Sequence, residues 1–351
     1  MERRAFLAAL LAAGSWPVWG RAATRDHRSP GPEWSHSAAT EGPSWGLVSA
    51  NELKMLEVDC PERAFDETRR ALSRMGSSDD FSDQEFINGA RGWAGGPDLD
   101  RSGLQWRFAN GVPVKVFGSG SGGVVMHMHG GGWVCGNAQS DHNLCDELAA
   151  RAGMTVVSVD YRLAPEHPFP IPIEDCLSVA RWLIANSGKE FGSDRLFITG
   201  CSAGAHLAAM TLLGLGPQAL RFGATALYYG VFDLGLTPAA RMARDEEHPD
   251  LSTTSLARMI DWFTPRLRRE QRQVASISPL YAPVPELPDT LFLVGGADIL
   301  TDDTLQLARR WAERNTVHLA LYPGAPHGFN AYDVAGVEDS LDRVVDFLTS
   351  R

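Results

Sequence analysis

The chain of 351 residues is long enough for one large α/β domain or two small ones. Hydrophobic residues account for 44% of the sequence, which suffices for a sizeable buried core. The formal net charge of −11 and the lack of a long basic run argue against nucleic acid as a partner.

The N-terminus resembles an export signal. Arg3 and Arg4 precede a Phe-Leu pair and an apolar stretch that ends at about residue 20, which is typical of twin-arginine signals. A glycine and a proline interrupt this stretch, which is too short for stable membrane insertion. We therefore expect residues 1–23 to be removed and the mature protein to be periplasmic or secreted. The alternative is an apolar cytosolic N-terminus.

A change of composition marks the start of the folded domain. Residues 24–46 are rich in Pro, Gly, Ser and His, which predicts a disordered linker. The domain is expected to occupy residues 47–351. Its first part contains two helix-like stretches, over 47–75 and 81–93.

From residue 104 onward, strand-like and helix-like patterns alternate. The stretches 104–108 and 112–117 flank a turn at 109–111 and predict an antiparallel hairpin. Further strands are predicted over 124–128, 155–159, 195–199, 222–229, 290–294 and 317–322, and helices over 174–185, 205–210, 255–263 and 303–314.

A glycine-rich loop, H-G-G-G-W at 129–133, follows the predicted strand 124–128. This run is a signal of esterases and lipases, in which backbone N–H groups stabilise an oxyanion. Glycines permit positive φ and a close approach of the backbone to a ligand. We nominate the N–H groups of Gly131, Gly132 and Ala203 as the oxyanion hole. A phosphate-binding P-loop is excluded because no Gly-Lys-Ser/Thr follows.

Three histidines near this loop, His127, His129 and His142, raise the question of a metal site. His127 and His129 would share one face of a strand. We favour a simpler interpretation, in which His127 packs in the core and His129 holds the glycine loop by hydrogen bonds. No metal or organic cofactor is then required.

The pentapeptide G-C-S-A-G at 200–204 lies between a predicted strand and a predicted helix. In that context G-x-S-x-G is a nucleophile elbow, whose sharp turn exposes the central residue above the helix N-terminus. Ser202 is therefore the predicted nucleophile. Cys201 is less suitable because it is not the central residue. Because G-x-S-x-G also occurs by chance, the alternative is a Gly/Ser loop at a helix start with no catalytic role.

Three segments together resemble the hormone-sensitive-lipase-like family of α/β-hydrolase esterases, also called bacterial family IV. They are H-G-G-G-W at 129–133, D-Y-R-L-A-P-E-H-P-F-P at 160–170 and G-x-S-A-G at 200–204, and the likeness runs from about Val124 to the C-terminus. The resemblance implies an α/β-hydrolase fold, with a mostly parallel central sheet flanked by helices. It also implies a helical cap from about 47–100 and 231–277, and structural roles for Asp160, Arg162 and Glu166.

In this fold the catalytic residues follow the order Ser, Asp or Glu, His. Asp298 comes after a predicted strand, where ligand groups of α/β sheets collect. It resembles the acid of the family, although Ile299 replaces the more usual proline. His327 lies in a tight loop after the last strand and resembles the histidine of the family. Asp302 and Asp303 fall at a helix start and are expected to cap that helix.

These residues predict a serine carboxylesterase that uses Ser202, His327 and Asp298. The resemblance implies short- to medium-chain acyl esters of small molecules as substrates. Three alternatives stay open. An arylformamidase-like amidase is one, because the S-A-G-A-H-L run at 202–207 also occurs in such hydrolases. A carbohydrate deacetylase would suit export. A non-catalytic ligand-binding homologue is the third, although the intact triad argues against it.

The cysteines form no C-x-x-C pair, which argues against a zinc ribbon. A Cys135–Cys145 disulfide is one option, but isolated thiols that act as small hydrophobic side chains are the preferred interpretation. The five are Cys60, Cys135, Cys145, Cys176 and Cys201. At the elbow, Cys201 stands where the family more often has Asp or Thr. Ala205 stands where the family more often has Gly.

Overall fold

The computed structural model describes residues 53–58, 65–66, 69–70, 82–83, 85, 87–88, 91, 105–248, 250–331 and 335–351. The predicted signal at 1–23 and linker at 24–46 lie outside the described residues. So do most of the two helix-like stretches and most of the first cap segment, 47–100.

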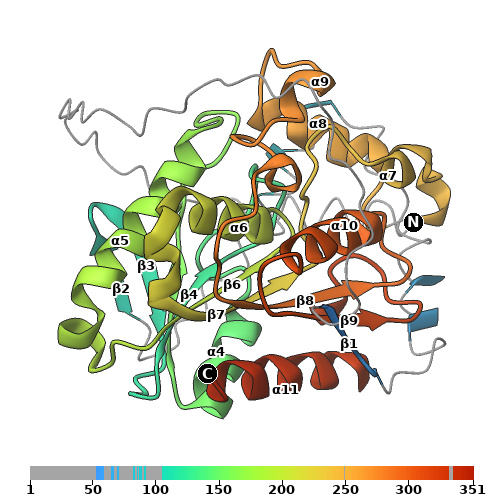
Figure 1. Cartoon of the computed structure of the whole chain (residues 1–351). Coiled ribbons are helices and arrows are strands. Elements are labelled where there is room, and N and C mark those ends of the chain that lie inside the picture. Colours follow the sequence, from blue (N-terminus) through green and yellow to red (C-terminus); the bar gives the residue numbers. More distant parts are fainter. Residues whose placement is uncertain are drawn as a thin grey trace, which may run out of the picture.

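One sheet forms the centre of the described part of the chain (Figure 1). Its nine strands run in the order β1-β9-β8-β7-β6-β4-β5-β3-β2. Neighbouring strands pair in parallel except where β3 meets β5 and β2. The strands are β1 (Leu53–Leu56), β2 (Gln105–Ala109), β3 (Val112–Phe117), β4 (Val124–Met128), β5 (Thr155–Val159), β6 (Leu196–Cys201), β7 (Phe222–Tyr228), β8 (Asp289–Gly295) and β9 (Val317–Tyr322).

Long helices cover the two faces of this sheet. α4 (His142–Ala152) and α11 (Ala335–Thr349) lie together below it in Figure 1, and α6 (Ala203–Leu215) and α10 (Thr301–Trp311) lie above it. α5 (Ile171–Phe191) packs against α6 and runs down the left of the picture. α6 is buried nearly all round, as expected of an apolar helix enclosed by neighbouring elements. The mostly parallel sheet between two helical layers confirms the predicted fold class.

The segment 231–277 departs from the strand–helix alternation and is called the insertion below. It carries α7 (Pro238–Met242), the 3₁₀ turn η3 (Asp245–Glu247), α8 (Thr253–Phe263) and α9 (Arg269–Arg272). These helices lie together at the top of Figure 1, beyond α6 and α10. The described residues also contain the 3₁₀ turns η2 (Gly216–Arg221), η4 (Pro279–Tyr281) and η5 (Phe329–Ala331).

One prediction is wrong where the structure describes it. Leu53–Leu56, expected to be helical and part of a cap, forms the edge strand β1, parallel to β9. Leu53 and Leu56 both pack against the core, while the side chain of Met55 is 57% exposed. A spacing of three between two apolar residues suits a helical stripe, so the sequence does not reveal the strand. The edge of β9 offers backbone partners to this segment, and that tertiary context overrides the pattern.

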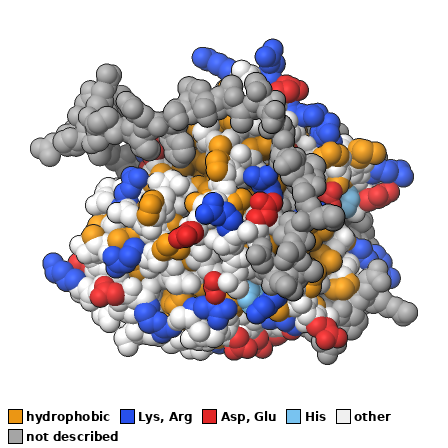
Figure 2. All heavy atoms as spheres, viewed as in Figure 1, with side chains coloured by type: hydrophobic (Ala, Val, Ile, Leu, Met, Phe, Trp, Pro, Cys, Tyr) orange, Lys and Arg blue, Asp and Glu red, His pale blue; other side chains and the backbone are white. Residues whose placement is uncertain are grey.

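Most other predicted elements are confirmed, with boundaries that differ by a few residues. The predicted hairpin is β2–β3, and its turn places Asn110 at φ 48° and Gly111 at φ 85°, the conformation that two-residue hairpin turns favour. No helix among the described residues is long and apolar enough to cross a bilayer. On the face in Figure 2, basic and acidic side chains are interspersed.

Candidate active site

Ser202 stands at the junction of β6 and α6. Its backbone adopts φ 54° and ψ −120°, a region that costs a non-glycine residue about 1–3 kcal/mol. The strained turn is held by the N–H of Ser202, which donates to the carbonyl oxygen of Tyr228 over 2.9 Å. This is the sharp strand-to-helix turn that G-x-S-x-G predicts.

The two glycines of the pentapeptide are required by close packing of backbone on backbone. A Cβ atom on Gly200 would lie 2.5 Å from the carbonyl oxygen of Gly204. A Cβ atom on Gly204 would lie 2.1 Å from the carbonyl oxygen of Met128 at the end of β4. Neither partner is a flexible side chain that could move aside. The glycines therefore let β6, α6 and β4 converge at Ser202.

Three side chains from distant parts of the sequence meet at the elbow. Ser202 Oγ lies 2.9 Å from Nε2 of His327, and Nδ1 of His327 lies 2.8 Å from Oδ2 of Asp298. The geometry fits a serine hydroxyl that donates to Nε2 and an Nδ1–H that donates to the carboxylate. The Asp298 side chain is fully buried and that of His327 is 12% exposed. The structure thus brings together all three residues of the predicted triad.

The surroundings of His327 favour its charged form. Burial by itself lowers the pKa of the imidazole, but the charge and the hydrogen bond of Asp298 raise it, and so does the charge of Asp250. The balance is a pKa above the ordinary histidine value. A raised pKa makes the neutral imidazole a stronger base toward the hydroxyl of Ser202.

The glycine loop after β4 has the backbone conformation that its sequence predicts. Gly131 and Gly132 have φ values of +111° and +57°. A Cβ on Gly131 would lie 2.3 Å from the carbonyl oxygen of Cys135, and one on Gly132 would lie 2.1 Å from Sδ of Met259 in α8. Within the described residues, the N–H groups of Gly131, Gly132 and Ala203 make no hydrogen bond to a protein acceptor.

Two histidines support this loop from below. Nδ1 of His129 lies 2.7 Å from the carbonyl oxygen of Gly130, and its ring stacks on Tyr161 with centroids 4.2 Å apart. His127 is fully buried, with Thr199 Oγ1 2.9 Å from Nδ1 and Asp141 Oδ2 2.9 Å from Nε2. The loop contact predicted for His129 and the core position predicted for His127 are both confirmed.

The histidines proposed as an alternative metal site do not gather at one point. Nδ1 of His142 lies 3.2 Å from the carbonyl oxygen of Gln139. A different set, His127, Asp141 and Cys201, places its ligand atoms within 4.8 Å of one another. Both ring nitrogens of His127 already have hydrogen-bond partners, so support of the loop accounts for this cluster.

The cysteine beside Ser202 is buried and reduced. Cys201 is 2% exposed, and Nδ2 of Asn330 lies 3.8 Å from its Sγ. Burial raises the pKa of its thiol well above the ordinary value, which keeps it neutral and a poor nucleophile. Cys135, Cys145 and Cys176 are also free and buried, as the sequence predicts for isolated thiols; Cys60 lies outside the described residues.

Charged residues of the 160–170 segment make structural contacts. Asp160 accepts a hydrogen bond from the N–H of Ala138. Arg162 donates to both carboxylate oxygens of Asp175 over 2.9 and 2.7 Å. Glu166 pairs with Arg91. The structural roles that the resemblance implies fit these contacts.

The prediction that Asp303 caps its own helix is wrong. Its Oδ2 accepts from the N–H groups of Phe232 and Asp233 over 2.7 and 2.8 Å, and Oδ1 accepts from Thr237 Oγ1 over 3.0 Å. Asp303 therefore anchors the start of the insertion to α10. The carboxylate that serves the N-terminal turn of α10 is Asp298, whose Oδ1 accepts from the N–H of Leu300.

Several residues near His327 have no signal in the sequence. Asp250 Oδ2 accepts from the N–H of His327 over 2.5 Å. The ring of Tyr229 meets that of His327 edge-on, with centroids 4.7 Å apart, and its hydroxyl donates to Asn330. Each contact joins residues far apart in the chain, so only the folded structure reveals it.

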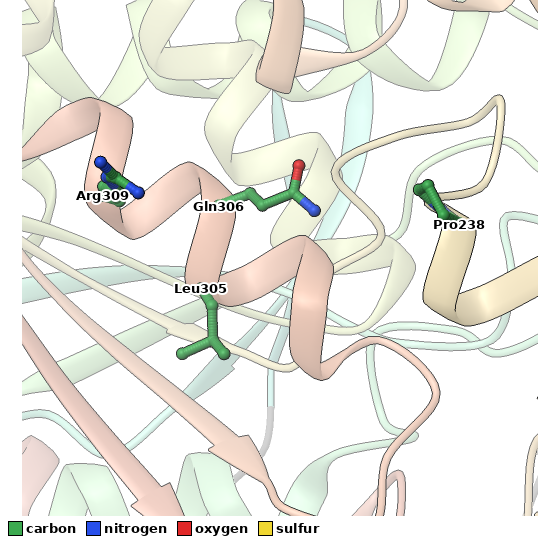
Figure 3. A pocket seen from close by; sticks show the side chains of 4 residues that line it. All are labelled: Pro238, Leu305, Gln306 and Arg309. Atoms are coloured by element: carbon green, nitrogen blue, oxygen red, sulfur yellow. The ribbon is translucent and has the colours of Figure 1, made fainter. Parts of the chain in front are cut away.

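A hollow of about 450 Å³ lies away from these residues, between α7 and α10. Figure 3 shows its lining: Pro238 projects from α7, and Leu305, Gln306 and Arg309 project from α10. None of the triad residues lines it. The hollow is therefore separate from the triad.

Comparisons with known proteins point to one family. A family model described as alpha/beta hydrolase fold matches residues 125–331. The esterase LipI of Mycobacterium tuberculosis is 31% identical over 52% of this chain and 58% of its own. An esterase of Acinetobacter venetianus is 30% identical over 65% of this chain and 75% of its own. The crystal structure of an esterase from the bacterial hormone-sensitive lipase family has a TM-score of 0.71 at 25% identity, covering 82% of this chain and 97% of that one.

The chain belongs to the α/β-hydrolase family, and within it to the hormone-sensitive-lipase-like esterases of bacterial family IV. It is a carboxylic ester hydrolase. The family predicted from the three sequence segments is confirmed. The match to LipI spans little more than half the length of that relative.

Proposed function

We propose that the protein is a serine carboxylesterase for short- to medium-chain acyl esters of small molecules, with Ser202 as nucleophile. One observation carries the proposal. It is the continuous hydrogen-bonded chain from Ser202 Oγ through the two ring nitrogens of His327 to Oδ2 of Asp298. A serine hydroxyl is a weak nucleophile until an oriented base takes its proton. In this series of hydrogen bonds His327 is the base and Asp298 orients it.

The reaction follows from this geometry. His327 takes the proton of Ser202 through Nε2 as Oγ attacks the ester carbonyl carbon, and Asp298 stabilises the imidazolium that forms. The imidazolium then protonates the leaving alkoxide, which departs as an alcohol and leaves an acyl group on Ser202. Water, deprotonated by His327, attacks the acyl carbon, and Oγ recovers its proton as the carboxylic acid leaves.

The negative oxygen of each tetrahedral intermediate is assigned to the N–H groups of Gly131, Gly132 and Ala203. No acceptor among the described residues binds these three N–H groups, which supports this role, because donors used elsewhere could not stabilise the oxyanion. A donor of this kind contributes about 2.7–4 kcal/mol to transition-state stabilisation. The positive φ values of Gly131 and Gly132 support the same assignment.

The insertion supports the preference for shorter acyl chains. Met259 of α8 sits against Gly132, where Sδ occupies the space that a Cβ would need. Phe263 of the same helix is fully buried and stacks on Trp133 at 4.6 Å. Bulky side chains of α8 therefore stand directly beside the proposed oxyanion hole and restrict the room for a long acyl chain.

Hydrolysis of p-nitrophenyl esters from acetate to palmitate tests the proposal. Turnover should be greatest for the short chains and should fall by about 10⁴-fold or more in Ser202→Ala, because the nucleophile is lost. Cys201→Ala is the matched control and should retain most of the activity, since its thiol is neutral and buried. Full activity in Ser202→Ala would contradict the assignment. Activity on aryl formamides instead of esters would favour the amidase alternative.

We also propose that the protein is exported by the twin-arginine route, which rests on Arg3, Arg4 and the apolar stretch after them. In a bacterium with that route, the full chain should reach the periplasm, whereas a chain without residues 1–23 should stay in the cytoplasm. Cell fractionation with activity or antibody detection measures this. Equal export of both chains would contradict the proposal.

A further inference from the structure

A short part of the insertion, residues 245–248 and 250–252, touches both loops that carry the histidine and the acid. Asp250 Oδ2 accepts from the backbone N–H of His327 over 2.5 Å. Two residues earlier, Nδ1 of His248 lies 3.0 Å from the carbonyl oxygen of Ala297, the residue before Asp298. This segment, called the clamp below, therefore contacts the two loops through side chains.

The clamp is itself anchored at both of its ends. Asp245 accepts from the N–H of Thr253 over 2.8 Å and from the hydroxyl of Thr254 over 2.6 Å. Ser252 caps α8, with its Oγ 3.0 Å from the N–H of Ser255. Thr253 Oγ1 donates to the carbonyl oxygen of Ala240 in α7. These bonds hold the residues on either side of Asp250 to α7 and to the start of α8.

The clamp also brings a second carboxylate to the imidazole. His327 faces Asp298 at Nδ1, Ser202 at Nε2, the ring edge of Tyr229, and the charge of Asp250. Asp250 faces His327 and the like charge of Asp298, and burial together with that charge raises its pKa, while His327 lowers it. The charge of Asp250 in turn raises the pKa of His327.

We propose that Asp250 is a positioning residue for the esterase reaction, which fixes the backbone of His327 and strengthens its imidazole as a base. The inference rests on the proposed function, because it concerns the histidine of the same triad. In this arrangement the carboxylate holds the loop at a single N–H, and its charge stabilises the imidazolium as Ser202 attacks. The insertion thereby contributes to the chemistry as well as to substrate access.

The charge and the hydrogen bond of Asp250 can be separated by substitution. Asp250→Asn keeps an acceptor for the N–H of His327 and removes the charge. The acid limb of the kcat/KM profile should then move to lower pH, because the imidazolium loses a stabilising neighbour. The plateau should fall about three- to tenfold, since a weaker base transfers the proton less effectively. The difference in kcat/KM between Asp250→Asn and the wild type should become smaller as the pH falls.

Glu270→Gln is the matched control, since it removes one exposed carboxylate from the same insertion. It should leave the pH profile of p-nitrophenyl acetate hydrolysis unchanged. A structural role alone would lower the activity of Asp250→Asn equally at every pH, and that result would overturn the proposal.

A readout that needs no activity separates this proposal from the proposed function. In protein labelled with ¹³C at histidine Cε1, the resonance of His327 is assigned by its loss in His327→Gln. Its titration midpoint should move to lower pH in Asp250→Asn and stay in place in Glu270→Gln. An unmoved midpoint in folded Asp250→Asn overturns the positioning role. If the midpoint moves as expected in Asp250→Asn but the wild type hydrolyses no ester, the proposed function is refuted and the positioning role is not.

Discussion

The serine side and the histidine side of the site are held in different ways. At Ser202, backbone packs on backbone: Gly200 and Gly204 have no space for a Cβ, and Gly204 abuts the end of β4. At His327, side chains from elsewhere hold the loop, with Asp298 on the ring and Asp250 on the backbone N–H. The first arrangement is local and steric, whereas the second depends on the fold that brings distant segments together.

This difference explains why the two sides respond differently to substitution. A steric contact between two backbones has no conservative replacement, because any side chain meets the same carbonyl oxygen. A hydrogen bond from a side chain can be retained in part by a similar acceptor. Substitutions on the serine side should therefore act as all-or-none changes, and those that affect the insertion should be graded.

Among substitutions that leave the side chains of Ser202, Asp298 and His327 in place, the largest effect on activity is expected for Gly204→Ala. The added Cβ would lie 2.1 Å from the carbonyl oxygen of Met128 and 2.5 Å from that of His129, so α6 and the glycine loop must separate. We expect a loss of stability of about 1–3 kcal/mol from overpacking. Activity on p-nitrophenyl acetate should fall by about 10²-fold or more, because the proposed oxyanion donors are displaced.

Gly223→Ala serves as the control for this prediction. Gly223 lies on β7. A Cβ there would lie 3.4 Å from the nearest atom, in the ring of Phe197, which is an ordinary van der Waals distance. Both variants are compared by thermal unfolding and by kcat/KM. If Gly204→Ala behaved like the control, the steric account of the serine side would fail.

A smaller effect on activity, with a loss mainly of stability, is expected for Asp303→Ala. The carboxylate accepts from two backbone N–H groups and one hydroxyl at the start of the insertion. Its removal leaves these buried donors unpaired, at a cost of about 2–5 kcal/mol in the free energy of unfolding. The neighbouring Asp302→Ala, with no such contact among the described residues, should cost under about 1 kcal/mol. If Asp303→Ala and Asp302→Ala lost the same free energy of unfolding in urea, the anchoring role of Asp303 would be contradicted.

The buried carboxyl group of Asp303 should also make the free energy of unfolding depend on pH. Burial raises its pKa to about 7, whereas the unfolded chain has the ordinary aspartate value of about 3.9. Between these values the folded protein binds a proton that the unfolded protein does not. Its contribution to stability therefore falls as the pH rises from about 4 to 7. Asp303→Asn should lack this part of the pH dependence when unfolding is followed across that range.

The same contrast decides what the sequence can predict. Ser202, the glycine loop and the strand–helix frame lie in short motifs whose residue types are dictated by backbone sterics. Asp298 and His327 were predictable because each follows a strand in the chain order that the fold requires. Asp250, Tyr229 and the anchoring role of Asp303 were not, because they act over separations of about 70 residues or more in the sequence. The edge strand β1 was missed for a related reason, since its partner β9 lies near the other end of the chain.

The most direct test of Ser202 as the activated nucleophile is covalent labelling by diethyl p-nitrophenyl phosphate. This electrophile reacts with an activated serine. We expect one diethylphosphoryl group per chain by intact-mass measurement. Fragmentation of the peptide between Cys201 and Ser202 should place it on Ser202, and Ser202→Ala should take up none. A label on Cys201, or a folded wild-type protein that takes up no label, would contradict the assignment of Ser202 as the activated nucleophile.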